Sequence, residues 1–142
     1  MIKSKKLNRF QNINHAFFNR IGGKSTGIFK SLNCGPGSAD KKKNILKNLT
    51  IVKKIISPKS KKIILLNQIH SNKFYFIDKN SKILRDKFEG DALITNRANL
   101  PIAVLTADCA PILIHDEKTK MIAAIHAGWK GAYKDIVIKV IN

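Results

Sequence analysis

Acidic residues are scarce in this chain of 142 residues, in which nine Asp and Glu stand against 27 Lys and Arg and give a formal net charge of +18. A charge this large favours polyanionic partners, either nucleic acid or a phosphate-bearing substrate. Arginine, with four residues, and aromatic residues, at 7% of the chain, are scarce too. Sequence-specific nucleic-acid-binding proteins read bases with Arg, and single strands are held by aromatic rings. We therefore expect that nucleic acid is not the main partner, and the A/T-rich codons of Lys, Ile and Asn offer a compositional reason for the charge.

Cysteine and long apolar stretches are also in short supply. Cys34 and Cys109 are the only cysteines, too few for a disulfide-stabilised scaffold. No apolar run reaches 18 residues, so we expect neither a transmembrane helix nor a membrane partner. Residues 1–6 are basic, but the apolar core of a signal peptide does not follow them. We expect a cytoplasmic protein with both cysteines reduced, and a disulfide between them is the alternative.

The length of the chain favours a single domain. Residues 1–12 are basic and polar and form an N-terminal segment, and residues 13–142 form the folded domain. The last predicted helix, over 130–141, has no Gly or Pro stop signal after it. We therefore expect that the chain ends within an element and lacks a C-terminal part.

Apolar spacing predicts the remaining elements. Over residues 40–56, apolar residues recur at spacings of three and four, which predicts a helix. Ser38 or Asp40 is the predicted N-cap of this helix. Short apolar runs bounded by turn residues predict strands over 15–20, 63–66, 74–77, 91–95, 102–106, 111–115 and 121–126.

One cysteine and two histidines stand at the ends of separate predicted strands. The segments QIHS, TADCAP and HAGWKG place His70, Cys109 and His126 beside small or turn-forming residues, where loops at one sheet edge carry function. Two His and one Cys are three of the four ligands of a tetrahedral zinc ion, and the open fourth position is typical of a catalytic site. The same residues could instead form a Cys–His nucleophile pair, and each taken alone is more often structural.

Three neighbours of these residues have two interpretations each. Asp108 either orients a metal-bound imidazole or caps a turn. Asp91, after Gly90 at a strand start, is typical of an Asx-turn. Trp129 either lines an aromatic wall for a planar substrate or packs in the core, which is the commoner role of tryptophan.

Arg20, Asn33 and Lys130 are the candidates for an anion site. A guanidinium grips phosphate with two parallel hydrogen bonds, and the Gly22–Gly23 pair after Arg20 can expose backbone N–H groups. Asn33 adds a side-chain amide. Lys130 adds charge at the start of the last predicted helix, where the helix dipole is positive.

Taken together, the segments FFNRIGGKSTGIFKSLNCG, NQIHS, GDALIT, TADCAPILIHD and AAIHAGWKGAYKDI resemble the motifs of the laccase-domain family, also called the YfiH or polyphenol oxidase family. The resemblance runs from about His15 to the C-terminus. It implies an α/β (α+β) fold, YfiH-like, with mixed β-sheets layered with outer helices. It also implies phosphorolysis of purine nucleosides (adenosine, inosine and methylthioadenosine) and deamination of adenosine.

The resemblance also implies roles for single residues. A zinc ion is held by His70, Cys109 and His126, which with Arg20 are the catalytic residues. Purine nucleoside and phosphate are the partners, with Arg20, Asn33 and Lys130 binding them. The family's oxidase label implies copper as the alternative metal, which a thiolate also binds. A copper-dependent polyphenol oxidase and a metal-free Cys-His hydrolase are therefore the alternative functions.

This chain departs from the family pattern at three points. Lys130 stands where the family usually has Arg, which keeps the charge and loses the bidentate fork. The segment LNCGPGSAD is an altered form of a family loop, so Cys34 is not a catalytic residue. Family members are longer than this chain, which supports the expectation of a missing C-terminal part.

Overall fold

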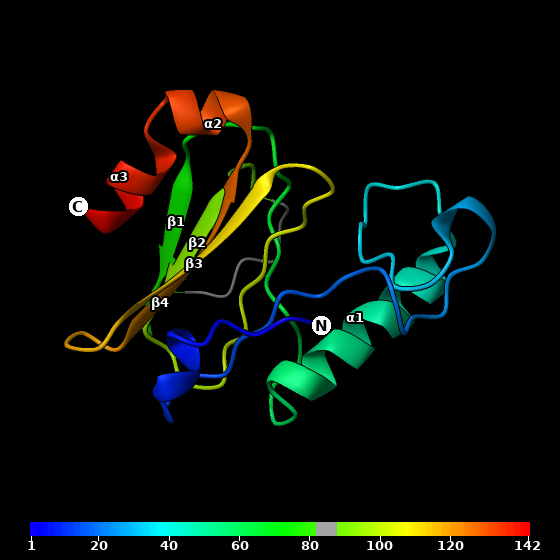
Figure 1. Ribbon diagram of the computed structural model, residues 1–142, viewed down its shortest axis with the longest axis horizontal. Helices are drawn as coiled ribbons and strands as arrows, with labels where there is room; N and C mark the ends of the chain where they lie inside the picture. The colour runs from blue at the N-terminus through cyan, green and yellow to red at the C-terminus, as the bar shows by residue number, and fades with distance from the viewer. Residues whose placement is uncertain (82–87) are drawn as a thin grey trace. The chain divides into compact units, whose positions relative to one another are not determined.

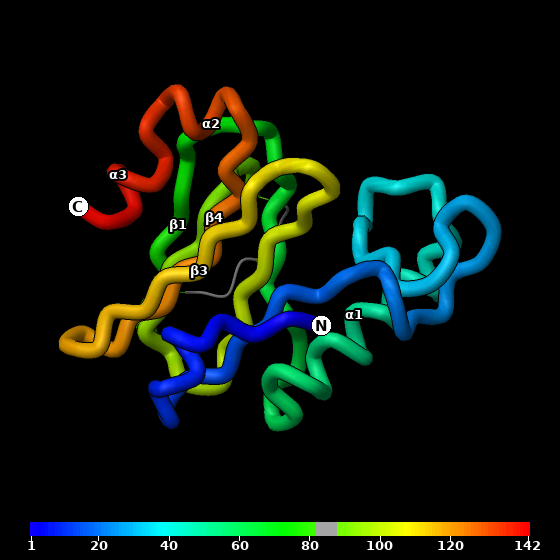
Figure 2. The backbone as a smooth tube through the Cα atoms, in the orientation of Figure 1, coloured from blue at the N-terminus to red at the C-terminus, as the bar shows by residue number. Residues whose placement is uncertain are grey.

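The computed structural model describes residues 1–81 and 88–142, and the chain divides into two compact units. The first unit comprises Met1–Lys62 and the second Ile63–Asn142. Figure 1 shows the elements of both units, and Figure 2 traces the backbone through them.

The first unit is built around one α-helix. Helix α1 spans Lys42–Ile56, as the apolar spacing predicts, and its buried residues are Ile45, Asn48 and Val52. The predicted caps are wrong, because the N-cap is Lys41 and no side chain caps the helix. The carboxylate of Asp40 instead accepts a hydrogen bond from its neighbour, the backbone N–H of Lys41. Two short 3-10 helices, η1 (Leu7–Arg9) and η2 (Gly27–Phe29), complete the unit.

The strand predicted over 15–20 is wrong. Phe17 pairs with Ile2 in an isolated antiparallel bridge, with backbone hydrogen bonds of 2.8 Å in both directions. The pairing does not continue, because the backbone N–H of Ser4 donates to the imidazole Nε2 of His15 instead of to a backbone carbonyl. A side chain thus replaces the next rung of the ladder.

Asn48 holds the loops of the first unit on α1. Its side chain is fully buried. Its amide Nδ2 donates to the Ser25 hydroxyl and to the carbonyls of Ser31 and Asn33, and its Oδ1 accepts from the backbone N–H of Lys24. One buried amide therefore satisfies polar groups across residues 24–33, as buried polar groups require.

The second unit contains a four-stranded mixed sheet. Its strands are β1 (Phe74–Ile77), β2 (Ala92–Thr95), β3 (Ala110–Asp116) and β4 (Met121–Ala127). Their order is β1-β2-β4-β3. The β1–β2 pair is parallel, and the β2–β4 and β3–β4 pairs are antiparallel. The predicted mixed sheet with helices is confirmed, and the four strands agree with four of the predicted segments to within about one residue.

Strand β2 is buried on both faces of the sheet. Leu93 packs on one face with Ile77, Ile64, Leu66 and Leu100. Ala92, directed to the other face, packs with Ile125 of β4 and Ile136 of the last helix. Alternate side chains of a strand point to opposite faces, so this short segment reads as a continuous apolar run.

The strands predicted over 63–66 and 102–106 are also wrong. These segments meet in one parallel bridge, between Ile64 and Ile102. Farther along, the side chain of Gln68 takes the place of a backbone partner: its Nε2 donates to the carbonyl of Leu105 and its Oε1 accepts from the N–H of Leu105, both at 2.7 Å. A side-chain amide has the same donor and acceptor as a peptide group, so it can take the place of a backbone partner. The backbone pairing of the two segments does not continue past this point.

The predicted C-terminal helix is divided in two. Helix α2 spans Trp129–Tyr133 and helix α3 spans Ile136–Ile141. Between them Asp135 adopts a left-handed conformation with φ of 58°, and the Asn72 side chain donates to the carbonyl of Lys134. Within the described residues, no helix combines the length and apolarity needed to cross a membrane.

Candidate metal centre

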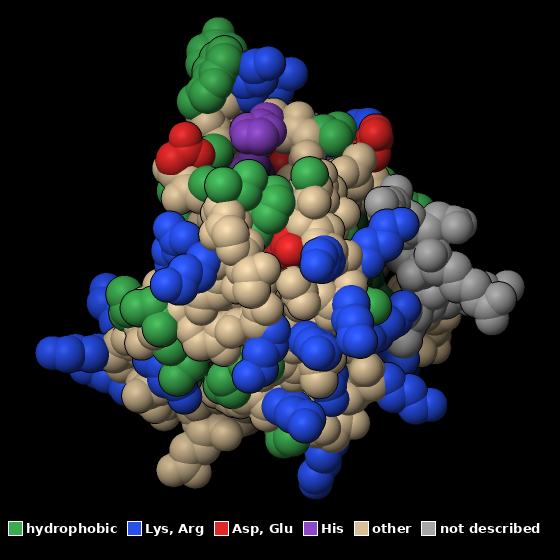
Figure 3. All heavy atoms as spheres, turned by 90° about the vertical axis from the view of Figure 1, so that its right-hand side faces the viewer, with side chains coloured by type: hydrophobic (Ala, Val, Ile, Leu, Met, Phe, Trp, Pro, Cys, Tyr) green, Lys and Arg blue, Asp and Glu red, His purple; other side chains and the backbone are tan. Residues whose placement is uncertain are grey.

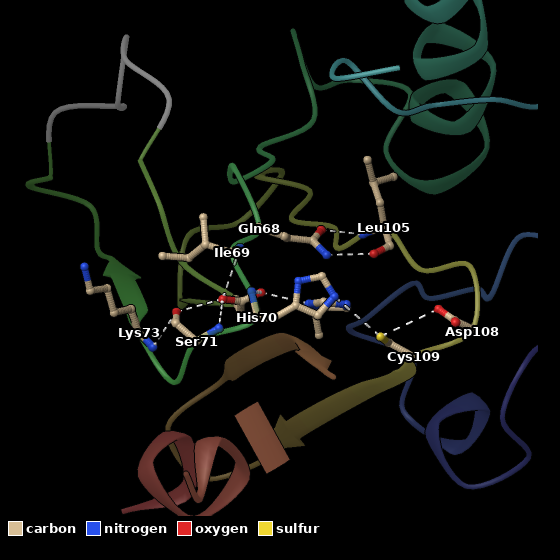
Figure 4. Close-up of polar contacts among 10 residues, drawn as sticks. Gln68, Ile69, His70, Ser71, Lys73, Leu105, Asp108 and Cys109 are labelled. Carbon is tan, nitrogen blue, oxygen red and sulfur yellow. Dashed lines mark hydrogen bonds and ion pairs between the residues drawn. The ribbon is translucent and has the colours of Figure 1, made fainter. Parts of the chain in front are cut away.

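His70, Cys109 and His126 converge in the second unit. His70 precedes β1, Cys109 directly precedes β3, and His126 lies in β4. One ligand atom from each lies within 4.8 Å of the others. The thiol sulfur of Cys109 is 3.8 Å from His70 Nε2, and the two imidazole rings meet edge to face with centroids 4.8 Å apart. Figure 4 shows His70 directed toward Cys109.

A buried carboxylate orients His126. Asp91 is fully buried, His126 is nearly so, and His126 Nδ1 lies 2.8 Å from Asp91 Oδ1. Because a carboxylate accepts a hydrogen bond, Nδ1 carries a proton, and in the neutral imidazole Nε2 keeps its lone pair. This is the outer-shell arrangement that fixes metal-binding histidines. The sequence suggested Asp108 as the partner of an imidazole, and the partner of His126 in the structure is Asp91.

Strand pairing brings Asp91 and His126 together. The β2–β4 register places Ala92 opposite Ile125, so the preceding and following residues also face each other. The backbone N–H of His126 donates to the Asp91 carbonyl at 2.7 Å. The signal that could have located Asp91 is an acidic residue at the start of one predicted strand, beside a histidine at the end of another.

Asp91 also holds the loop that carries His70. Its carboxylate accepts hydrogen bonds from the His70 backbone N–H at 3.0 Å and from the Ser71 N–H and hydroxyl at 2.6 and 2.7 Å. Burial raises the pKa of the Asp91 carboxyl, but the donors from His126, Ser71 and His70 outweigh burial and leave that pKa below its ordinary value. The ionised carboxylate therefore organises two of the three potential ligands, including His70 with its φ of 57°.

Asp108 acts on the thiol instead. The Cys109 thiol donates to Asp108 Oδ1 at 3.8 Å. Burial, together with the charge and the hydrogen bond of Asp108, raises the pKa of the Cys109 thiol above its usual value. A catalytic cysteine needs a lowered pKa, and a bound metal cation would favour the thiolate form of this sulfur.

Gly128 keeps the centre of the cluster open. A Cβ atom added at Gly128 would lie 2.7 Å from His70 Cδ2, 3.3 Å from Cys109 Sγ and 3.6 Å from His126 Cε1. The backbone φ of Gly128 is −71°, which any residue adopts, so the glycine is needed for space. Two imidazole nitrogens and one sulfur around a space kept free of side-chain atoms fit a tetrahedral zinc ion with one open position.

The Gln68 side chain fixes the distance between two of the segments. Its paired hydrogen bonds to Leu105 connect the segment that leads to His70 with the segment that leads to Cys109, as Figure 4 shows. Gln68 stands in the segment NQIHS, but no pattern in the sequence indicated this role.

The residues predicted to bind substrate lie in different units. In the second unit, Lys130 in α2 is exposed, with its Nζ 5.4 Å from the Trp129 ring. Trp129 itself is 75% exposed, so it does not pack in the core. In the first unit, the Arg20 guanidinium donates to the Lys30 carbonyl, and the Asn33 amide donates to Ser38 and Asp40. A shared site of Arg20, Asn33 and Lys130 stays a prediction.

Comparison with known proteins identifies similar chains. Residues 14–142 match a family model described as multi-copper polyphenol oxidoreductase laccase. The chain is 33% identical over 96% of its length to a purine nucleoside phosphorylase of Bacteroides thetaiotaomicron, and 36% identical over 91% to one of Corynebacterium glutamicum. It covers 53% and 52% of these two relatives, and so spans about half the length of the curated proteins that it matches.

Solved structures agree with this comparison. A Neisseria meningitidis protein is 32% identical with a TM-score of 0.74, over 86% of this chain and 48% of that one. The Bacillus licheniformis hypothetical protein YfiH is 26% identical with a TM-score of 0.76, over 84% of this chain and 47% of that one. The similarity thus extends to the fold.

Proposed function

Since this chain belongs to the multi-copper polyphenol oxidoreductase laccase family, we propose that it carries the metal centre of a zinc-dependent purine nucleoside phosphorylase. The observation that supports this most directly is the convergence of His70, Cys109 and His126, with ligand atoms within 4.8 Å of one another. Relatives named as purine nucleoside phosphorylases supply the reaction class. The proposed substrates are adenosine, inosine and methylthioadenosine, with adenosine deamination as a second activity.

The donor set favours zinc. His70 and His126 offer imidazole nitrogens and Cys109 a sulfur, which zinc accepts in tetrahedral sites. Copper also binds such ligands, but the described residues contain one three-ligand group of this kind, where a multi-copper oxidase needs several metal ions. A bound zinc ion would supply Lewis-acid polarisation of a substrate or water oxygen.

The chain's own residues would position the metal ligands and bind the phosphate. Asp91 keeps His126 in the tautomer whose Nε2 is free, and it fixes the His70 backbone. We assign phosphate binding to Arg20, Asn33 and Lys130. In phosphorolysis, a phosphate oxygen forms a bond to C1′ of the ribose while the bond from C1′ to the purine nitrogen breaks, and the purine leaves with a proton. In deamination, water replaces the 6-amino group of adenosine and ammonia leaves.

A metal-free Cys-His hydrolase is the less well supported alternative. Cys109 Sγ lies 3.8 Å from His70 Nε2, beyond the roughly 2.6–3.2 Å of a tight nucleophile–base contact. His126 Nδ1 is held by Asp91, which would suit the base of a catalytic triad equally well, but the pKa of the Cys109 thiol is raised. The Cys109–His70 distance and the raised pKa favour a cysteine that becomes a thiolate when a metal binds.

The decisive experiment is to measure bound metal in the purified protein and in two cysteine variants. We expect about one zinc per chain, lost in Cys109→Ala and retained in Cys34→Ala. Cys34 is the matched control because it is the other free cysteine and lies in the first unit. A folded protein that binds no metal, or that binds it equally well as Cys109→Ala, would overturn the proposed centre.

Activity is then assayed separately. The zinc-loaded protein is incubated with each nucleoside, with and without phosphate, and products are separated by chromatography. Phosphate-dependent release of adenine from adenosine supports phosphorolysis, and inosine formation supports deamination. Activity that survives chelation would favour the hydrolase, and oxidation of a phenol after copper loading would favour the oxidase.

A further inference from the structure

The positive charge of this protein is concentrated in its first unit. Residues 1–62 contain 16 of the 27 Lys and Arg and one of the nine acidic residues, for a net charge of +15. Residues 63–142 contain the other 11 basic and eight acidic residues, for a net charge of +3. The average over the whole chain conceals this division.

Base composition does not explain the division. A bias toward A/T-rich codons acts on a whole gene, and one gene encodes both units. Such a bias would raise the lysine content throughout, and it would not remove all but one acidic residue from the first 62 positions. The asymmetry therefore indicates a property of the first unit itself.

The basic side chains of the first unit are available to a partner. All 16 are exposed except Lys53, whose Nζ donates to the Ser60 carbonyl. The single acid, Asp40, accepts hydrogen bonds from Asn33 and from the Lys41 N–H. The ion pair found among the described residues, His126 with Asp91, lies in the second unit. Figure 3 shows a face of the molecule on which basic side chains are widespread and acidic ones are few.

Helix α1 presents some of these charges in a row. Lys43, Lys47 and Lys54 are four and seven residues apart, with Thr50 between the last two, and all four are exposed. Residues at these spacings share one side of an α-helix, with about 6 Å of axial rise per four residues. The opposite side carries the buried Ile45 and Val52, so the row faces solvent.

We propose that the first unit binds the phosphate backbone of nucleic acid, through a surface that includes Lys43, Lys47 and Lys54. Lysine ammonium groups bind phosphates as point charges, and this binding needs no base-reading arginines. The exposed large hydrophobic residues of the first unit are aliphatic, so no exposed aromatic ring offers base stacking. The binding is therefore electrostatic and independent of sequence.

An anionic membrane is the other polyanion to consider, and the helix argues against it. A helix that lies in a membrane interface exposes an apolar face with Trp, Phe or Leu residues. The buried side of α1 carries Ile45 and Val52, and the lysine row contains Thr50 in place of an apolar residue. Leu46 and Ile55 are exposed, but they are nine residues apart and lie on opposite sides of the helix, so they form no apolar face. The observations thus favour a phosphate backbone over a lipid surface.

The test is a titration of the full chain into fluorescently labelled RNA and DNA duplexes of mixed sequence, at several salt concentrations. The test variant is the triple Lys43→Gln, Lys47→Gln and Lys54→Gln. The control is the triple Lys79→Gln, Lys118→Gln and Lys139→Gln, which removes three exposed lysines from the second unit. Circular dichroism and metal content establish that both variants are folded.

Duplex binding by the wild-type chain should weaken steeply with salt. The first triple should lower affinity about tenfold or more and make the slope of log affinity against log salt shallower by about 2.7, because three phosphate contacts are lost. The second triple should change neither. Equal loss in both triples, or no binding at about 50 mM salt, would overturn the proposal. Stronger binding to phosphatidylcholine vesicles with about 30% phosphatidylserine, at equal phosphate concentration, would overturn it in favour of a membrane.

Discussion

His126 Nδ1 and Asp91 Oδ1 lie 2.8 Å apart in the buried part of the candidate metal centre. The same carboxylate accepts hydrogen bonds from the backbone N–H groups of His70 and Ser71. One side chain therefore orients a potential ligand in strand β4 and holds the loop that carries a second one. In the proposed metal centre, Asp91 would position two of the ligands without being a ligand itself.

Replacing Asp91 with Asn should weaken zinc binding by about 10- to 100-fold, the usual loss when a carboxylate partner of a metal-binding histidine is removed. The neutral amide is a weaker acceptor for the His126 Nδ1–H. Its NH₂ group must also replace an oxygen that accepts hydrogen bonds, so a donor would face the donors of His126 and His70 or those of Ser71. Competition with a chromophoric chelator measures the affinity.

Asp78→Asn is the matched control for that change. Asp78 also accepts hydrogen bonds from a serine, Ser81, through both the backbone N–H and the hydroxyl, and it lies outside the cluster. Its substitution should leave zinc affinity unchanged. Equal affinities in both variants and the wild type would mean that Asp91 stabilises the loop without influencing the metal.

The sequence predicted the parts of this site that depend on local patterns. The apolar runs over 111–115 and 121–126 predicted strands β3 and β4, and the turn-rich contexts of His70, Cys109 and His126 singled them out. The role of Asp91 was missed because it depends on the β2–β4 register, which joins residues 35 positions apart. Pairing between distant segments leaves no signature in either segment alone.

Two wrong predictions share a physical cause. The segments 15–20 and 63–66 have the composition of strands, but side chains replace backbone partners beside each of them. His15 accepts the Ser4 N–H, and Gln68 takes both hydrogen bonds of Leu105. Apolar patterning predicts that a segment is extended and buried, and it does not show whether a backbone or a side chain completes the hydrogen bonding.

Gly128→Ala should remove bound metal without unfolding the protein. The new methyl carbon would lie 2.7 Å from His70 Cδ2, so the imidazole must move away from the cluster. The backbone conformation of Gly128 suits alanine, and the melting temperature of the metal-free protein should change by no more than about 2 °C. Metal analysis and a thermal melt in chelator test both expectations.

Gly37→Ala is the control for this substitution, because a Cβ there would meet no atom within 4 Å. It should retain full zinc content. If Gly128→Ala binds zinc as tightly as Gly37→Ala does, the space beside Gly128 is not where the metal lies.

Asn48→Ala should destabilise the first unit by about 1–3 kcal/mol, because it removes a buried amide that hydrogen-bonds to several part-buried backbone groups. The groups affected are the Lys24 N–H and the carbonyls of Ser31 and Asn33. Urea unfolding followed by circular dichroism measures the change. The exposed Asn12→Ala is the control and should alter stability by less than about 0.5 kcal/mol. Similar losses from both substitutions would show that the buried amide is not the feature that holds these loops on α1.

Asp108→Asn should make the Cys109 thiol more reactive in the metal-free protein. Burial raises the pKa of this thiol, and the charge and hydrogen bond of Asp108 raise it further. Since only the thiolate reacts with iodoacetamide, the alkylation rate of the parent protein should rise with pH to a midpoint above about 8.5, the ordinary value for cysteine. Neutralising Asp108 removes two of the causes that favour the protonated thiol, so the midpoint should move to lower pH. The measurement is made in a Cys34→Ala background, so that Cys109 is the one thiol present. A midpoint that stays in place, or moves upward, would show that Asp108 does not control the protonation of Cys109.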